Sequence, residues 1–150
     1  MTTCTISKEV EFDAGHRVPS HGSKCRNPHG HRYRVRVLCS GTIVNDPGAP
    51  DDGMLVDFGD LKALMTTLIH DPLDHSFICH ESDPLLAALQ MWDPTWNVVD
   101  FPFIPTAENI ARWCWDQLDE PITERFRDGL QLAEVAVWET PTSVAYYHGS

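Results

Sequence analysis

Three histidines in the first third of the chain have the residue type and spacing of a metal site. His29 and His31 form an HxH pair in CRNPHGHRY, and His16 lies upstream in FDAGHR. Alternate residues of a β-strand project to the same face, so an HxH pair on a strand presents two imidazoles together. Three neutral imidazoles and an open fourth position are the ligand set of a catalytic zinc ion. A histidine-rich loop on an ordinary surface is the alternative interpretation.

A thiol and a carboxylate–imidazole pair are candidate proton carriers. Cys25 lies in the loop before the histidine pair, where a nearby dication or cationic pocket would lower the pKa of its thiol and make a thiolate available. Asp74 precedes His75 in PLDHS, and an aspartate can orient a neighbouring histidine for proton transfer. Each has an ordinary interpretation as well: an incidental loop cysteine, and an exposed polar turn after Pro72.

Two carboxylates are candidates for binding a ligand. Glu139 lies near the end of the segment AEVAVWET and shares the parity of Val135 and Val137, so its side chain is predicted on an apolar face. A buried carboxylate needs a partner, and a heterocycle with two N–H donors, such as the amino-pyrimidinone of a pterin or guanine, would supply one. Glu108, in PTAEN, is interpreted either as a first-turn charge that favours the helix dipole or as a supporting residue.

Two strands are predicted to position the histidines. Apolar residues occupy the even positions from Thr5 to Ala14, with Lys8 as the exception, and the odd positions from Arg32 to Ser40, which is the period of a strand with one buried face. His16 has the even parity, and His29 and His31 have the odd parity, so all three point inward if the strands extend to them. Antiparallel pairing would place the end of the first strand beside the start of the second. The imidazoles would then converge at one end of the sheet.

The other predicted elements complete an α+β fold of order β-β-α-α-β-β, with a four-stranded antiparallel sheet and two helices on one face. Apolar stripes and capping residues predict the helices, and alternation predicts the strands. These elements are helices at about 58–70 and 107–118, capped by Asp57 and Thr106, and strands at 130–139 and 143–147.

The length of 150 residues predicts a single domain over 1–150 with a core of its own. The segment at about 77–104 fits this pattern poorly, because it mixes large apolar residues with prolines and aspartates. We interpret it as a long insertion with a short helix near 85–91, since loops of this length are usually functional or structured.

Charge and cysteine usage limit the class of protein. The formal net charge of −11 disfavours nucleic acid as a partner, because phosphate contacts need a basic face. The five cysteines are scattered and form no CxxC pair, which is typical of reduced thiols in a cytoplasmic protein. The sequence shows no apolar signal core and no run of transmembrane length, so no membrane association is expected.

The chain resembles the 6-pyruvoyl-tetrahydropterin synthase / 6-carboxy-tetrahydropterin synthase family. The matching motifs occur in the order that the family has and span nearly the whole chain. They are FDAGH (12–16), CRNPHGHRY (25–33), GMLVDFGDLK (53–62), LDHS (73–76), PTAENIARWCWDQL (105–118) and VAVWET (135–140). Together they are far more specific than any one of them, although segment 77–104 looks longer than the usual connection in the family.

The resemblance implies a fold, an assembly and residue roles. The fold is the tunnelling fold, in which subunits join their sheets into a barrel, usually as a homohexamer with active sites at subunit interfaces. The implied roles are zinc binding by His16, His29 and His31, proton abstraction by Cys25, a proton relay by Asp74 and His75, and a pterin pocket formed by Glu139, Thr106 and Glu108.

The implied substrate is dihydroneopterin triphosphate, and the resemblance allows two reactions. The carboxy-forming enzyme releases triphosphate and acetaldehyde to give 6-carboxy-tetrahydropterin, in the biosynthesis of queuosine and other 7-deazaguanines. We favour it for this compact, acidic chain. The pyruvoyl-forming enzyme of tetrahydrobiopterin biosynthesis eliminates triphosphate, and the motifs do not separate the two. A non-catalytic zinc- or pterin-binding module is the third alternative. Arg17, Lys24 or Arg26 would be the residues to meet the triphosphate.

Overall fold

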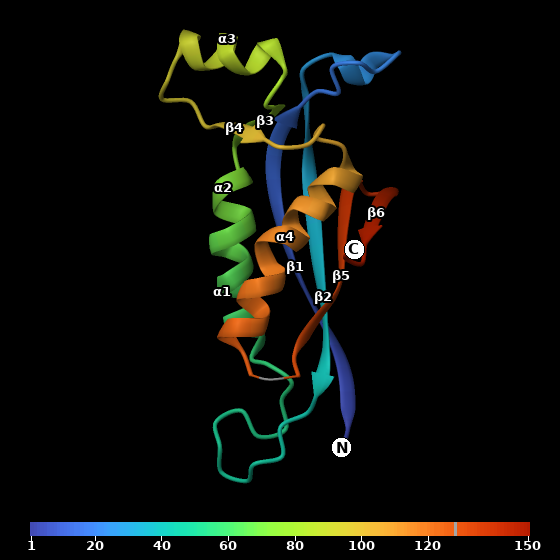
Figure 1. The fold of residues 1–150 in the computed structure, drawn as a ribbon, viewed down its shortest axis with the longest axis vertical. Helices are drawn as coiled ribbons and strands as arrows, with labels where there is room; N and C mark the ends of the chain where they lie inside the picture. The colour runs from blue at the N-terminus through green and yellow to red at the C-terminus, as the bar shows by residue number, and fades with distance from the viewer. Residues whose placement is uncertain (128) are drawn as a thin grey trace.

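A long antiparallel pair of strands forms the centre of the fold in the computed structural model, which describes residues 1–127 and 129–150. Strand β1 (Thr3–His16) pairs along its whole length with β2 (His29–Thr42), and Figure 1 shows both running the length of the molecule. Phe12 lies opposite Tyr33, and both are buried. The predicted strands and their pairing are confirmed, and both strands extend as far as the histidines.

The sheet has six strands within the described residues and is mixed, so the predicted four-stranded antiparallel sheet is wrong. Its order is β4-β3-β1-β2-β5-β6. The two predicted C-terminal strands are present and antiparallel, as β5 (Gln131–Thr140) and β6 (Ser143–Tyr147). The additional strands, β3 (Ser76–His80) and β4 (Val98–Phe101), run parallel to β1. Strands of five and four residues are too short for alternation to reveal them, and parallel strands covered on both faces lose the alternation altogether.

The first predicted helix is three consecutive helical segments. They are α1 (Phe58–Met65), a π-helical turn η2 (Thr66–His70) and α2 (Asp71–Leu73). Asp57 caps the start as predicted, since its carboxylate accepts a hydrogen bond from the amide of Gly59 at 2.6 Å. Capping of this kind satisfies an amide that has no partner within the helix.

The second predicted helix, α4 (Ala107–Arg125), is longer than expected. Thr106 caps it by accepting from the amide of Asn109 at 3.3 Å. The helix continues through Pro121 although an interior proline costs about 3 kcal/mol. Ile122 extends the buried stripe by one turn past Leu118, and this burial offsets the lost hydrogen bond. Helices α1 and α4 pack their apolar sides on the same face of the sheet, as predicted (Figure 1).

The segment between α2 and α4 carries β3, α3 (Pro84–Trp92) and β4. The short helix expected near 85–91 is therefore confirmed. Helix α3 lies at the end of the molecule where β1 ends, beyond β3 and β4 and apart from the layer that α1 and α4 form (Figure 1). Among the helices of the described ranges, none has the length and apolar character needed to cross a membrane.

Candidate metal centre and active site

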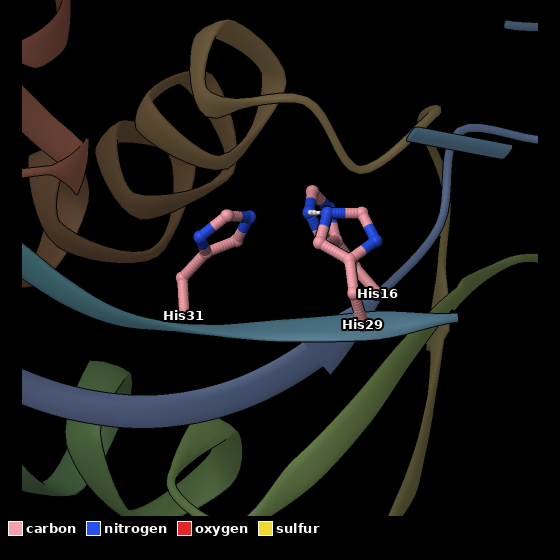
Figure 2. Close-up of side chains that lie close together, drawn as sticks. All are labelled: His16, His29 and His31. Carbon is pink, nitrogen blue, oxygen red and sulfur yellow. Dashed lines mark hydrogen bonds between the residues drawn. The ribbon is translucent and has the colours of Figure 1, made fainter. Parts of the chain in front are cut away.

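The three predicted metal ligands come together at the end of the central strand pair (Figure 2). The register places His16 directly opposite His29, and His31 follows on the same face of β2. The ring centroids are 4.6 Å apart for His16 and His29, 4.9 Å for His29 and His31, and 5.1 Å for His16 and His31. One nitrogen of each ring lies within 4.8 Å of the others. This is the arrangement that strand parity predicts.

Backbone carbonyls orient two of the imidazoles. The Nδ1–H of His16 donates to the carbonyl of Pro105 at 2.6 Å, and the Nδ1–H of His29 donates to that of Asn27 at 2.7 Å. A carbonyl oxygen only accepts, so these bonds place the ring proton on Nδ1 and leave a lone pair on Nε2. A metal-binding histidine almost always has this kind of support for its other nitrogen.

The free nitrogens fit a bound cation. The Nε2 atoms of His16 and His29 lie 3.2 Å apart (dashed line in Figure 2). With both Nδ1 atoms protonated, neither neutral ring has a hydrogen to share across this gap, so the two lone pairs repel unless a cation lies beside them. The Nε2 of His31 is buried and has no hydrogen-bond partner among residues 1–127 and 129–150. The cluster can therefore hold a metal ion through three Nε2 atoms.

Burial and a nearby carboxylate set the electrostatics of the cluster. Burial lowers the pKa of His16 and of His31, which favours the neutral, metal-binding form of each ring. The carboxylate of Glu139 at the end of β5 opposes this shift, since its oxygens lie 3.5 Å from Nε2 of His31 and 4.0 Å from Nε2 of His16. Glu139 thus lies on the inward face, as its parity predicts, and adds negative charge beside the cluster.

Tyr33 places a buried hydroxyl beside the imidazoles. Its ring is edge-on to His16 and His31, with centroids 5.9 and 5.6 Å away. The hydroxyl oxygen is buried, and within the described part of the chain it has no hydrogen-bond partner. Burial raises the pKa of this phenol, so the hydroxyl stays protonated.

We expect Tyr33→Phe to leave the free energy of unfolding of the metal-free protein unchanged or to raise it by about 1 kcal/mol, because a buried hydroxyl without a partner is costly. Urea unfolding of chelator-treated protein measures this. The matched control is Tyr33→Leu, which also removes the ring and should destabilise the core. A loss of more than about 1 kcal/mol in Tyr33→Phe would reveal a hydrogen bond to the hydroxyl in solution.

Asp74 and His75 form a hydrogen-bonded pair on the side of the sheet that faces away from the histidine cluster. The Nδ1–H of His75 donates to Asp74 at 2.8 Å, and Asp74 also accepts from the amide of Asp13 at 3.0 Å. His75, at a φ of 57°, donates its own amide to the carbonyl of Asp13 at 2.7 Å. The side chain of Asp13 pairs with Arg32 on the outward face, and that of His75 is 80% exposed. One copy of the chain therefore does not bring this pair to its own histidine cluster.

We expect Asp74→Asn to lower the pKa of His75. The hydrogen bond that His75 donates to Asp74 raises that pKa above its ordinary value because the carboxylate stabilises the imidazolium, and asparagine removes the charge while keeping the shape. NMR titration of the His75 ring measures the change. Asp71→Asn is a matched control, since Asp71 contacts His70 instead. An unchanged His75 titration in Asp74→Asn would contradict the assignment.

The remaining predicted site residues lie around the same end of the sheet. Cys25 is half-buried in a one-turn helix, η1 (Lys24–Arg26), and its carbonyl accepts from the amide of Val18 at 2.8 Å, which folds the loop back towards β1. Thr106 directly follows the carbonyl that holds His16. Glu108 is exposed in the first turn of α4.

Sequence reasoning missed three contacts of this site. The carbonyls of Asn27 and Pro105 orient the imidazoles, and every residue type has a carbonyl, so side-chain chemistry gives no signal for them. The third contact is the ion pair of Arg17 with Asp83. It engages the guanidinium that was a candidate for binding the triphosphate.

Known proteins with similar sequences agree with the resemblance that the motifs indicate. A model of the family described as 6-pyruvoyl tetrahydropterin synthase matches residues 5–150. A protein of Haemophilus influenzae named 6-carboxy-5,6,7,8-tetrahydropterin synthase is 37% identical over 147 residues, which cover 95% of this chain and 96% of that protein. A protein of the same name from Synechocystis is 35% identical over 95% of this chain and 91% of its own length.

Solved structures agree with the fold. An uncharacterised protein of Wolinella succinogenes has a TM-score of 0.80 at 25% identity, and the match covers 100% of both chains. The 6-pyruvoyl tetrahydropterin synthase of Caenorhabditis elegans has a TM-score of 0.70 at 25% identity and covers 100% of this chain and 98% of its own.

Proposed function

The chain belongs to the 6-pyruvoyl tetrahydropterin synthase family, and from this premise we propose that it is a zinc-dependent 6-carboxy-tetrahydropterin synthase. The reaction would convert dihydroneopterin triphosphate and one molecule of water to 6-carboxy-tetrahydropterin, triphosphate and acetaldehyde. The observation that carries the proposal is the cluster of His16, His29 and His31, with Nε2 lone pairs facing one another and Glu139 beside them. Curated relatives of nearly the same length, named for this product, support the choice of reaction.

The three imidazoles would hold a zinc ion through Nε2, and neutral histidines with an open fourth position suit zinc. A zinc ion held in this way polarises substrate oxygens and stabilises developing negative charge on them. Glu139 would add to the affinity for a dication. It would also pair with two N–H donors of the pterin ring, because a carboxylate accepts two parallel hydrogen bonds.

The proton transfers would fall to Cys25 and to the Asp74–His75 pair. Cys25 would abstract a proton from a carbon of the substrate side chain as its thiolate, because only the thiolate is an effective base or nucleophile. His75 would exchange a second proton, and Asp74 would hold its imidazole by the Nδ1 hydrogen bond. Thr106 and Glu108 would frame the pterin pocket at the start of α4.

The site would be shared between copies of the chain. His75 and the histidine cluster lie on opposite sides of the sheet of one copy, so a neighbouring copy would supply one half of each site. This supports the assembly that the tunnelling fold implies, in which a homohexamer carries its active sites at subunit interfaces. A cytoplasmic location stays a prediction from cysteine usage.

We expect Glu139→Gln to weaken binding of a pterin about 10- to 100-fold, because hydrogen bonds to a charged group are worth about 1.5–3 kcal/mol and the amide presents a donor where an acceptor is needed. Fluorescence titration with 6-carboxypterin measures the affinity. Glu134→Gln is the control, because Glu134 pairs with Arg36 and His148 away from the cluster. Zinc content should stay near one per chain. A loss of zinc with unchanged pterin affinity would show that Glu139 serves the metal alone.

The test of the proposed function is incubation of zinc-loaded protein with dihydroneopterin triphosphate and identification of the products by mass spectrometry. Carboxy-tetrahydropterin with acetaldehyde supports the proposal. Pyruvoyl-tetrahydropterin would favour the elimination reaction, the second activity found in this family. Binding without turnover would favour a non-catalytic pterin-binding module.

A further inference from the structure

Helix α3 carries large apolar side chains that its own chain leaves uncovered. Leu86 packs inward, whereas Met91 and Trp92 are 86% and 79% exposed, and Trp96, just beyond the helix, is also exposed. Contiguous exposed apolar surface of this kind marks interaction sites. The exposed methionine and tryptophans are also residue types that protein interfaces enrich.

A hollow lies beside this helix and reaches the proton-transfer pair. Its volume is about 390 Å³, and Leu85, Leu89, Phe77 and Trp96 line it together with His75. His75 also lines an adjoining hollow, whose other lining residues include Asp13, His31 and Arg32. The apolar surface of α3 is therefore continuous with the surface at which His75 is exposed.

The helix is held rigidly in this place. Asp83 caps α3 by accepting from the amide of Leu85 at 2.9 Å, and the same carboxylate forms a buried ion pair with Arg17 at the end of β1. A surface fixed in this way loses little conformational entropy on binding a partner.

Charge indicates which partner can cover α3. The segment PLLAALQMW has no ionisable side chain, although the whole chain carries a net charge of −11. A large net charge of one sign disfavours contact between copies of the chain, and a surface without ionisable groups adds nothing to that repulsion. Glu81 and Asp93 flank the helix, and acidic flanks oppose an anionic membrane surface.

We propose that a second copy of the chain covers α3 and its hollow, and that this copy is the one whose histidine cluster meets His75. The inference rests on the proposed function in one respect, the division of the site between copies. Beyond the proposed function, the inference assigns segment 77–104 as a contact between subunits. This contact would close the shared site on the side where His75 is exposed.

Hydroxyl-radical footprinting of the wild-type protein tests the contact without substrate. In one copy Met91 is 86% exposed and Met54, which lies near Cys4 at the start of β1, is 40% exposed. If α3 is covered, Met91 is oxidised more slowly than Met54, the reverse of the order in a single copy. Oxidation of Met91 at the rate of the same residue in the unfolded chain overturns the proposal.

The double variant Met91→Gln/Trp92→Gln tests the energetics. Both side chains are exposed, so the fold of one copy should persist, and circular dichroism checks this. We expect sedimentation equilibrium to show subunit dissociation at least about tenfold easier, because apolar anchors dominate interfaces. Met54→Gln is the matched control and should assemble like the wild type. Unchanged assembly of the double variant would overturn the inference.

These measurements also separate the inference from the proposed function. A protein that assembles through α3 but makes no carboxy-tetrahydropterin contradicts the proposed function alone. A protein that turns over while Met91 reacts freely contradicts the inference alone.

Discussion

Replacing His29 with alanine is expected to abolish metal binding, with zinc falling from about one per chain to near zero. The Nε2 of His29 lies 3.2 Å from that of His16, so its removal opens one side of the ligand set. Turnover should fall at least ~10³-fold, because a catalytic metal ion contributes several kcal/mol of charge stabilisation. Zinc should also stop raising the melting temperature, since a ligand stabilises only a protein that binds it. Metal analysis and thermal unfolding with and without a chelator measure both effects independently of activity.

The control for His29→Ala is His21→Ala. His21 is an exposed histidine a few residues away, and its Nδ1 accepts from the amide of Ser23 within its own loop at 3.0 Å. This variant should keep zinc, thermal stabilisation and turnover. Stoichiometric zinc in His29→Ala would mean that His16, His31 and Glu139 suffice, and the ligand assignment would have to change.

The sequence predicted the histidine cluster because strand parity translates directly into geometry. The alternation in 5–14 and 32–40 fixes which residues point inward, and antiparallel pairing fixes which ends meet. His16 and His29 are therefore opposite each other in the observed register. A period of two leaves little freedom, since a slip of one residue would expose the whole apolar face.

The parts that sequence reasoning missed depend on contacts without a local pattern. Strands β3 and β4 form only by pairing with β1 and with each other, and few residues take part. The carbonyl of Pro105 reaches His16 through tertiary folding, and the carbonyl of Asn27 lies two residues before His29 but is a group that every residue type has. Adjacency in sequence placed Asp74 beside His75, but it could not say which face of the sheet the pair occupies. The face that the pair occupies determines whether it can act at the histidine cluster of its own copy or only at that of another copy.

A mixture of two inactive variants is expected to recover activity if the site is shared. Cys25→Ala and His75→Ala should each lose at least ~10²-fold in turnover, because each removes a proton-transfer group. After joint unfolding and refolding at equal amounts, about a quarter of the sites in random assemblies would combine an intact Cys25 with an intact His75 from different copies. Turnover of the mixture should therefore approach about a quarter of the wild-type value for a fully shared site.

The control for this mixture pairs Cys25→Ala with the double variant Cys25→Ala/His75→Ala, which leaves every site without a thiol and should stay inactive. Mass spectrometry of intact assemblies verifies that the two chains have mixed. If mixed assemblies of the two single variants remain inactive, each copy must complete its own site. The Asp74–His75 pair would then have to leave Asp13, to which it makes two backbone hydrogen bonds, and cross to the other face of the sheet. Breaking buried or half-buried hydrogen bonds of this kind costs about 1 kcal/mol each, so the shared site is the arrangement that keeps the observed fold intact.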